Sequence, residues 1–280
     1  MRRTVFVLSF AVAAAAAAQT PAPDQPPAPP AGKPLWEAGL VVGGGRVSDY
    51  PGAGQSHTRG LVAPFVVYRG PVLNVDGEGI RGRLVDHPDF ELQLTASAAF
   101  NARDNDARDG MPELDYLFGI GPQILYKGLR GVPGAPTLHL KARALFSTDF
   151  QRIDGRGASL EPELRWRLER FGGSSAALVL GIQPTWASRA LHRYFYEVTP
   201  DQALPSRPAY AARAGYLGTE WKATLSRRVS TSVSWFVAAR AMTLHGAANE
   251  DSPLLRRKSQ LDVGAGLVWT PWRSSRPAAD

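Results

Sequence analysis

The most restrictive feature of this 280-residue sequence is an alternation of apolar and polar side chains that recurs along most of the chain. In residues 90–100, each apolar residue from Phe90 to Ala96 is followed by Glu, Gln, Thr or Ser. A period of two residues predicts β-strands with one apolar and one polar face. Such segments are 36–44, 61–69, 72–84, 90–100, 114–126, 138–146, 160–168, 178–186, 213–226, 233–241 and 261–269. No segment shows a clear helical period, so we expect an all-β fold.

Strand length distinguishes between two all-β folds. Strands of a soluble sandwich average about 5–6 residues, whereas tilted strands that cross a membrane need about 9–11. In segment 114–126, one face carries Tyr116, Phe118, Ile120, Ile124 and Tyr126, with a tyrosine at each end. Ten residues at a rise of about 3.3 Å and a tilt of about 40° span roughly 25 Å, the height of the apolar band of a membrane barrel. The lengths favour a barrel over a soluble periplasmic β-domain, which remains the alternative.

The polar faces carry charges of both signs. They include Lys141 and Arg143 on one segment and Glu161, Glu163, Arg165 and Arg167 on the next. We interpret these faces as the interior of a barrel lined with cross-strand ion pairs. The expected fold is a closed antiparallel transmembrane β-barrel, since closure leaves no unpaired strand edge in the lipid.

The eleven segments do not fix the number of strands, because bacterial single-chain barrels have an even number. A miscounted pair within 66–84 would give ten strands. Two strands within 210–228 would give twelve, which is the number we expect.

The first eighteen residues have the pattern of a cleaved secretory signal peptide. Arg2 and Arg3 precede an apolar run that ends in Ala16–Ala18, and the run is too short for a permanent transmembrane helix. Residues 19–34 are rich in proline and are expected to form an extended, disordered lead-in. The expected organisation is therefore a signal peptide (1–18), the lead-in (19–34), one barrel domain (35–272) and a tail (273–280).

The composition limits which interactions can stabilise the fold and which partners the protein can bind. The chain has no cysteine, so no disulfide framework stabilises an exported form. Removal of Arg2 and Arg3 lowers the formal net charge from +7 to +5. For an exported protein, a basic surface indicates lipid phosphates or murein carboxylates as targets, and not nucleic acid.

Three groups of residues together resemble a known family of outer-membrane proteins. The first comprises Trp36, Gly39 and Gly43, then Asp49, Tyr50, Pro51 and Gly52, then Pro64, Tyr68 and Arg69. The second is the segment 193–216, RYFYEVTPDQALPSRPAYAARAGY, and the third is 249–269, which contains Asp251, Ser252, Pro253 and Leu254. Their order and spacing are similar to those of the MltA-interacting protein (MipA/OmpV) family.

The resemblance implies a non-enzymatic barrel in the outer membrane of a Gram-negative cell envelope. It further implies a scaffold that holds a lytic transglycosylase near a murein synthase on the peptidoglycan. A small-solute channel and a surface adhesin or stress-linked protein remain the alternatives. The sequence departs from the usual barrel ending, because RSSRPAAD follows the last aromatic residues, Trp269 and Trp272.

Catalytic, nucleotide and metal sites are not favoured. The glycines in 41–54 are not followed by an amphipathic helix, as a nucleotide-binding loop requires. The five histidines, His57, His87, His139, His192 and His245, show no arrangement with serine suited to a lipid hydrolase. Segment 104–115 is acidic, but its glycine and its final Asp115 do not fit a calcium loop. We therefore expect no cofactor, no metal and no catalytic residue.

Two surface features remain. Arg256, Arg257 and Lys258 form a basic cluster that could bind lipopolysaccharide phosphates or could be an ordinary charged loop. The tryptophans are expected to anchor the barrel at the two membrane interfaces, and they are Trp36, Trp166, Trp186, Trp221, Trp235, Trp269 and Trp272.

Overall fold

The computed structural model describes residues 34–69, 73–76, 79–87, 89–99, 101–102, 104–132 and 134–276, with the side chains of 68–69, 73–76 and 79–86 left out. The predicted signal peptide, nearly all of the proline-rich lead-in and the last four residues of the tail lie outside this range. Within it, no helix is long and apolar enough to cross a bilayer.

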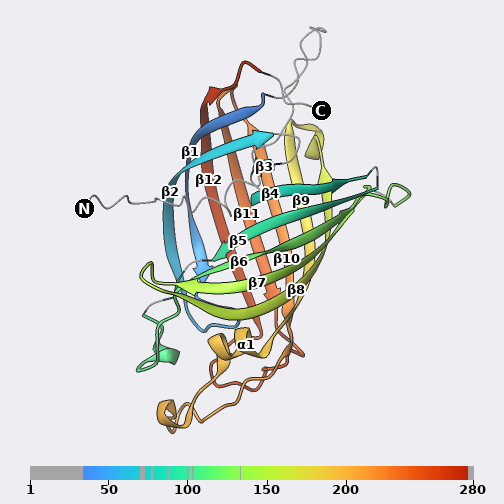
Figure 1. Ribbon diagram of the computed structural model, residues 1–280. Coiled ribbons are helices and arrows are strands. Elements are labelled where there is room, and N and C mark those ends of the chain that lie inside the picture. The colour runs from blue at the N-terminus through green and yellow to red at the C-terminus, as the bar shows by residue number, and fades with distance from the viewer. Residues whose placement is uncertain are drawn as a thin grey trace, which may run out of the picture.

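The described chain is built almost entirely from antiparallel strands (Figure 1). Ten strands are long: β1 (Trp36–Ser48), β2 (Ser56–Arg69), β5 (Phe90–Ala99), β6 (Tyr116–Tyr126), β7 (Thr137–Thr148), β8 (Ile153–Leu168), β9 (Ala176–Ala187), β10 (Gly215–Arg228), β11 (Val233–Thr243) and β12 (Ser259–Arg273). Two are short: β3 (Leu73–Asp76) and β4 (Gly79–Asp86). The all-β prediction is confirmed.

Each strand pairs with its neighbours in the sequence, and the first strand also pairs with the last. The hydrogen-bonded order is β1-β12-β11-β10-β9-β8-β7-β6-β5-β4-β3-β2. Val42 of β1, for example, faces Leu267 of β12 on one side and Val62 of β2 on the other. The smallest ladder joins β2 to β3 through two residue pairs.

The position of the extra strand differs from our expectation. Segment 72–84, read as one strand, contains both β3 and β4, which pair Asp76 with Gly79 across a tight connection. Segment 210–228 holds the single strand β10 and not two, because Tyr210 forms an isolated bridge with Val198 outside the sheet. The Asp-Gly pair at 76–77 is a hairpin signal that the long apolar run obscured.

The two faces of the sheet are chemically opposite to those of a soluble β-protein. Large apolar side chains are exposed on the outer face, including Val62 (69% exposed) and Leu267 (55%). Polar side chains that alternate with them are buried on the inner face, including Glu163 (1%) and His139 (3%). Several predicted anchoring tryptophans are exposed on the outer face, namely Trp36, Trp186, Trp221, Trp269 and Trp272.

The glycines of β1 belong to the ladder between the first and last strands. A Cβ atom added at Gly39 would lie 1.9 Å from the backbone oxygen of Trp269, and one at Gly45 would lie 2.3 Å from that of Val263. Both distances are far below van der Waals contact, so only glycine permits this approach. The glycine-rich run 43–45 therefore has a packing role in this ladder.

The connections divide between the two ends of the sheet. Short turns, Leu35 and the end of β12 lie at one end, where Leu35 N donates to Arg276 O at 2.8 Å. The long connections 49–55, 100–115, 188–214 and 244–258 lie at the other, together with the helix α1 (Arg189–Tyr196) at the bottom of Figure 1. In the described part of the chain, three single-turn 3-10 helices lie in connections: η2 (Asp106–Arg108), η3 (Phe171–Gly173) and η4 (Pro200–Gln202).

Candidate functional site

The inner face of the sheet carries a network of ion pairs centred on Glu163 of β8. Its carboxylate accepts hydrogen bonds from Lys141 Nζ of β7 and from Arg165 Nη2, the latter at 3.1 Å. Lys222 Nζ of β10 lies 3.9 Å away. Gln183 of β9 lies between the two lysines, and its Oε1 accepts from Lys141 at 3.0 Å and from Lys222 at 2.8 Å.

The network continues across β10, β11, β12 and β1. Glu220 pairs with Lys222 at 3.3 Å and with Arg240 at 3.4 Å. Arg240 Nε donates to Asp262 Oδ2 at 3.1 Å. The other oxygen of Asp262 accepts from the backbone N and the hydroxyl of Ser48, at 2.8 and 2.7 Å. We call these residues the ion-pair belt: Ser48, Lys141, Glu163, Arg165, Gln183, Glu220, Lys222, Arg240 and Asp262.

The six charges singled out in the sequence fall into three places. Lys141, Glu163 and Arg165 belong to the belt. Arg143 Nε donates to Glu161 at 3.2 Å beside it. Arg167 pairs with Glu169 at an exposed end of β8, where both side chains reach solvent. Glu220, Lys222, Arg240 and Asp262 were missed, although the alternation in segments 213–226, 233–241 and 261–269 places them on polar faces.

The belt is suited to fixing strand register. Each charge in it has a partner of opposite sign, and several of the pairs join neighbouring strands, so a slip by one residue would leave charges buried without partners. A row of like charges, which would select ions of one sign, is not formed by the belt residues.

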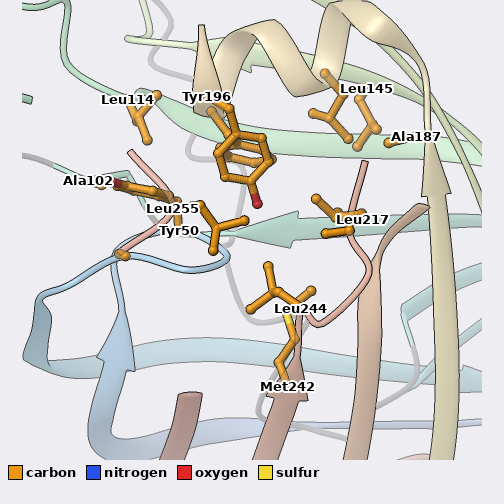
Figure 2. Packing of buried hydrophobic residues seen from close by; sticks show 14 residues of the cluster. Tyr50, Ala102, Leu114, Leu145, Ala187, Tyr196, Leu217, Met242, Leu244 and Leu255 are labelled. Carbon is orange, nitrogen blue, oxygen red and sulfur yellow. The ribbon is translucent and has the colours of Figure 1, made fainter. Parts of the chain in front are cut away.

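The long connections meet in a second cluster, which we call the loop cap (Figure 2). Its buried apolar residues are Tyr50, Ala53, Ala102, Leu114, Leu145, Ala187, Leu191, Phe195, Tyr196, Leu217, Met242, Leu244, Ala247 and Leu255. Some come from strand ends and the others from four separate connections. The long connections therefore share one apolar core, which holds them together at one end of the sheet.

Hydroxyl groups tie the connections of the loop cap to one another. Tyr50 donates to Leu254 O, Tyr196 to Pro51 O and Ser252 to Tyr196 O, each at 2.8 Å. Burial raises the pKa of Tyr50 to about 12, and the nearby Arg108 opposes this shift. The phenol therefore stays protonated and able to donate at neutral pH.

Two buried arginines bind backbone carbonyl groups across the loop cap. Arg108 Nη1 donates to Phe195 O at 3.1 Å, and Arg207 Nη1 donates to Ala107 O and Asp109 O at 3.1 and 2.9 Å. Burial lowers the pKa of Arg108, with Tyr50 acting in the opposite direction. No sequence pattern distinguishes these two arginines from exposed ones, so sequence reasoning missed them.

Most of the quoted family-motif residues lie at the loop cap or on β1. Tyr50, Pro51, Gly52 and Ser252 make contacts between connections, and Gly52 O accepts from the backbone N of Arg256 at 2.8 Å. Asp49 is buried and binds His57 Nδ1 at 2.6 Å and Asn105 Nδ2 at 2.8 Å. Asp251 and Pro253 flank Ser252 in the same connection. Trp36 and Gly39 lie on β1, whereas the side chains of Tyr68 and Arg69 are outside the described ones.

The remaining predicted residues do not assemble into a reactive centre. Arg256 and Arg257 are exposed at the loop-cap end, and Lys258 pairs with Glu250. His192 is fully buried in α1 and contacts Gly215 O at 3.1 Å. Among the described residues, no group of three His, Cys, Asp or Glu side chains could hold a metal ion.

Comparison with known proteins gives one family match. The family model described as MltA-interacting protein MipA matches residues 40–271. No curated protein matches the chain significantly. Among solved structures, the COG4313 outer membrane channel from Pseudomonas putida F1 aligns at 12% sequence identity and a TM-score of 0.45, covering 88% of this chain and 100% of that one. Because the family match runs from β1 to β12, this chain belongs to the MltA-interacting protein MipA family.

Proposed function

We propose that this protein is a closed, twelve-stranded β-barrel of the outer membrane that acts as a non-enzymatic scaffold for murein-remodelling enzymes. Family membership is the single observation that carries the partnership, since the family is named for interaction with MltA, a lytic transglycosylase. A murein synthase is the expected second partner, and outer-membrane lipid and lipopolysaccharide are the expected surroundings.

Two structural features support the membrane assignment. The exposed outer face is apolar along the long strands, as contact with lipid requires, and the charged groups of the ion-pair belt on the inner face are paired. The pairing of β1 with both β2 and β12 supports closure.

The elements on the inner side of the sheet support a scaffold more than a channel. The loop cap occupies one end, and a second apolar cluster, Val41, Phe65, Val67, Phe236 and Val268, lies on the inner face. The ion-pair belt runs along the inner face from β7 to β12 and reaches the end of β1. Conduction would require an open path past the loop cap and the ion-pair belt.

The position of the long connections supports an orientation. Bacterial outer-membrane barrels have short periplasmic turns and longer extracellular loops. By this rule the loop cap faces outward and the short turns face the murein. Arg256, Arg257 and Lys258 then lie on the side of the lipopolysaccharide phosphates, as contacts with these phosphates would require.

The test is pairwise binding with purified components. The protein, refolded in detergent and checked by heat-modifiability on a gel, is immobilised and exposed to a purified MltA-type lytic transglycosylase. The scaffold proposal predicts saturable binding that a denatured sample lacks. Absence of binding, together with discrete single-channel openings in planar bilayers, would favour the channel instead.

A further inference from the structure

An apolar cluster lies on the inner face of the sheet near its short-turn end. We call it the inner apolar cluster, and its residues are Val41 of β1, Phe65 and Val67 of β2, Phe236 of β11 and Val268 of β12. Each of them lies within five positions of the short-turn end of its strand. Because these four strands are neighbours in the sheet, the cluster lines one side of the short-turn mouth.

The two phenylalanine rings of the cluster lie against glycines of the adjacent strand. Phe236 is opposite Gly266 of β12, and a Cβ atom added at Gly266 would lie 2.7 Å from its ring. Phe65 is opposite Gly39 of β1, and a Cβ atom added at Gly39 would lie 3.0 Å from its ring. Each ring therefore lies along the wall, and its opposite face is presented to the interior.

The interior side of this lining calls for an apolar cover. All five cluster residues are at most 8% exposed. Among the described residues, the cluster packs against one further apolar side chain, that of Ala238. The same inner face carries the ion-pair belt, and apolar surface beside charged groups is stabilised when an apolar segment covers it. An apolar segment from outside the described residues would complete this packing.

The chain itself has a segment of suitable length at this mouth. Leu35 N donates to Arg276 O at 2.8 Å beyond the ends of β1 and β12, so the residues before Pro34 start next to strands that carry the cluster. Cleavage after Ala18, as the sequence predicts, leaves residues 19–33 ahead of this point. These residues would span roughly 45 Å as a polyproline II helix, whereas the cluster extends about 17 Å into the sheet.

The composition of residues 19–33 suits an aromatic lining. The segment contains six prolines and three alanines and has no large apolar side chain that would need a deep pocket. Proline-rich segments bind aromatic-lined surfaces at a low entropic cost, because their backbone is already extended. Gly32 supplies a position at which the chain can turn back toward the mouth. We infer that residues 19–33 enter the short-turn mouth and pack their prolines on the inner apolar cluster.

This inference gives the lead-in a role that its composition alone does not predict. The bound segment closes the barrel at the end opposite the loop cap, so each mouth is covered by the chain's own residues. The inference goes beyond the scaffold function and depends on no partner protein. Its failure and the failure of the scaffold proposal are therefore separate results.

The experiment identifies what contacts the cluster in the mature protein, refolded into phospholipid vesicles. A photoreactive diazirine side chain replaces Ala238, which borders the cluster. The matched control carries the same side chain in place of Leu125, which is buried on the inner face of β6 next to the short-turn end. Folding of each variant is first checked by heat-modifiability, and after irradiation mass spectrometry identifies the residue or lipid that is cross-linked.

We expect position 238 to cross-link to residues 19–33 with a yield several-fold above that at position 125. Phe236→Ser should lower the yield at position 238 about fivefold, because it removes one of the two rings. Phe146→Ser is the control for this substitution, since Phe146 is exposed on the outer face of β7, and it should leave the yield unchanged.

Other occupants of the cluster give other products. A cross-link from position 238 to phospholipid, or to a second, isotope-labelled copy of the chain, overturns the inference. Cross-links to neighbouring strands alone also overturn it, because the cluster then has no added cover. Equal yields at positions 238 and 125 overturn it as well, since the segment would then enter the mouth without choosing the apolar wall.

Discussion

Replacement of Glu163 by glutamine tests the ion-pair belt at its centre. The substitution keeps the size of the side chain and removes the negative charge that faces Lys141, Arg165 and Lys222. The consequence differs among the three cations because their access to water differs. The Lys141 side chain is only 7% exposed, whereas those of Arg165 and Lys222 are 20% and 32% exposed.

The expected loss of stability follows from this difference in exposure to water. Removing one partner of a buried ion pair costs about 3–5 kcal/mol, mainly because the remaining charge stays buried without compensation. Lys141 fits this case, and the two more exposed cations can be hydrated and add little. We therefore expect the free energy of unfolding to fall by about 3 kcal/mol, which is roughly a hundredfold in the unfolding equilibrium.

A second substitution provides the rescue. In Lys141→Met with Glu163→Gln, both buried charges are absent, and Gln183 still accepts from Lys222 at 2.8 Å. This double variant should regain most of the stability, to within about 1 kcal/mol of wild type, because an apolar replacement of a buried pair is often neutral. Glu169→Gln is the surface control, since its pair with Arg167 is exposed and should be worth about 0–1 kcal/mol.

The assay is reversible urea unfolding of the protein in lipid vesicles, followed by tryptophan fluorescence and by the folded band on a gel. The reasoning is refuted if Glu163→Gln costs no more than Glu169→Gln. It is also refuted if the double variant is as unstable as the single one, because the cost would then not come from an uncompensated Lys141.

Three further perturbations address the rest of the fold. Gly39→Ala should prevent normal pairing of β1 with β12 and lower the free energy of unfolding by about 1–3 kcal/mol, because the added Cβ would lie 1.9 Å from Trp269 O. Gly60→Ala is the control, because the nearest atom to its added Cβ is 4.0 Å away. The control variant should give the normal folded band on a heat-modifiability gel. Tyr196→Phe should remove the hydrogen bond to Pro51 O, lower the free energy of unfolding by about 1–3 kcal/mol and speed tryptic cleavage within 188–214. An unchanged cleavage rate would contradict the role of this hydrogen bond. Burial lowers the pKa of His192 below 6.5, so the unfolded chain takes up a proton at this histidine more readily than the folded chain does. The stability associated with His192 is therefore present above pH 6.5 and is lost as the pH falls below that value. In unfolding measured as a function of pH, His192→Gln should flatten this dependence.

Alternation in the sequence predicted the ten long strands and their two faces, because the side-chain period of a strand is fixed by its backbone, but it did not divide 72–84 into β3 and β4. It also indicated the charged residues of β7 and β8 that lie on the inner face. Alternation could not predict which residues these charges pair with, because the pairing of Lys141 with Glu163 and Gln183 depends on the register of three strands. Register is set by turns and by the sheet as a whole.

The loop cap could not have been predicted from local patterns. Tyr50, Arg108, Tyr196 and Ser252 are far apart in the chain, and they meet only because antiparallel strands return every second connection to the same end. The acidic segment 104–115 does not match a calcium loop, and instead its Leu114 packs into the loop cap and its Arg108 binds Phe195 O there. Convergence of this kind depends on topology and not on residue spacing.

The placement of the family-motif residues bears on where partner specificity lies. Tyr50, Pro51, Gly52 and Ser252 bind other connections of the same chain, so substitutions there should first affect the stability of the loop cap. If these motif residues serve the fold and not the partner, Ser252→Ala should lower the thermal midpoint and leave the Kd for the lytic transglycosylase unchanged. The reverse result would place recognition in the loop cap.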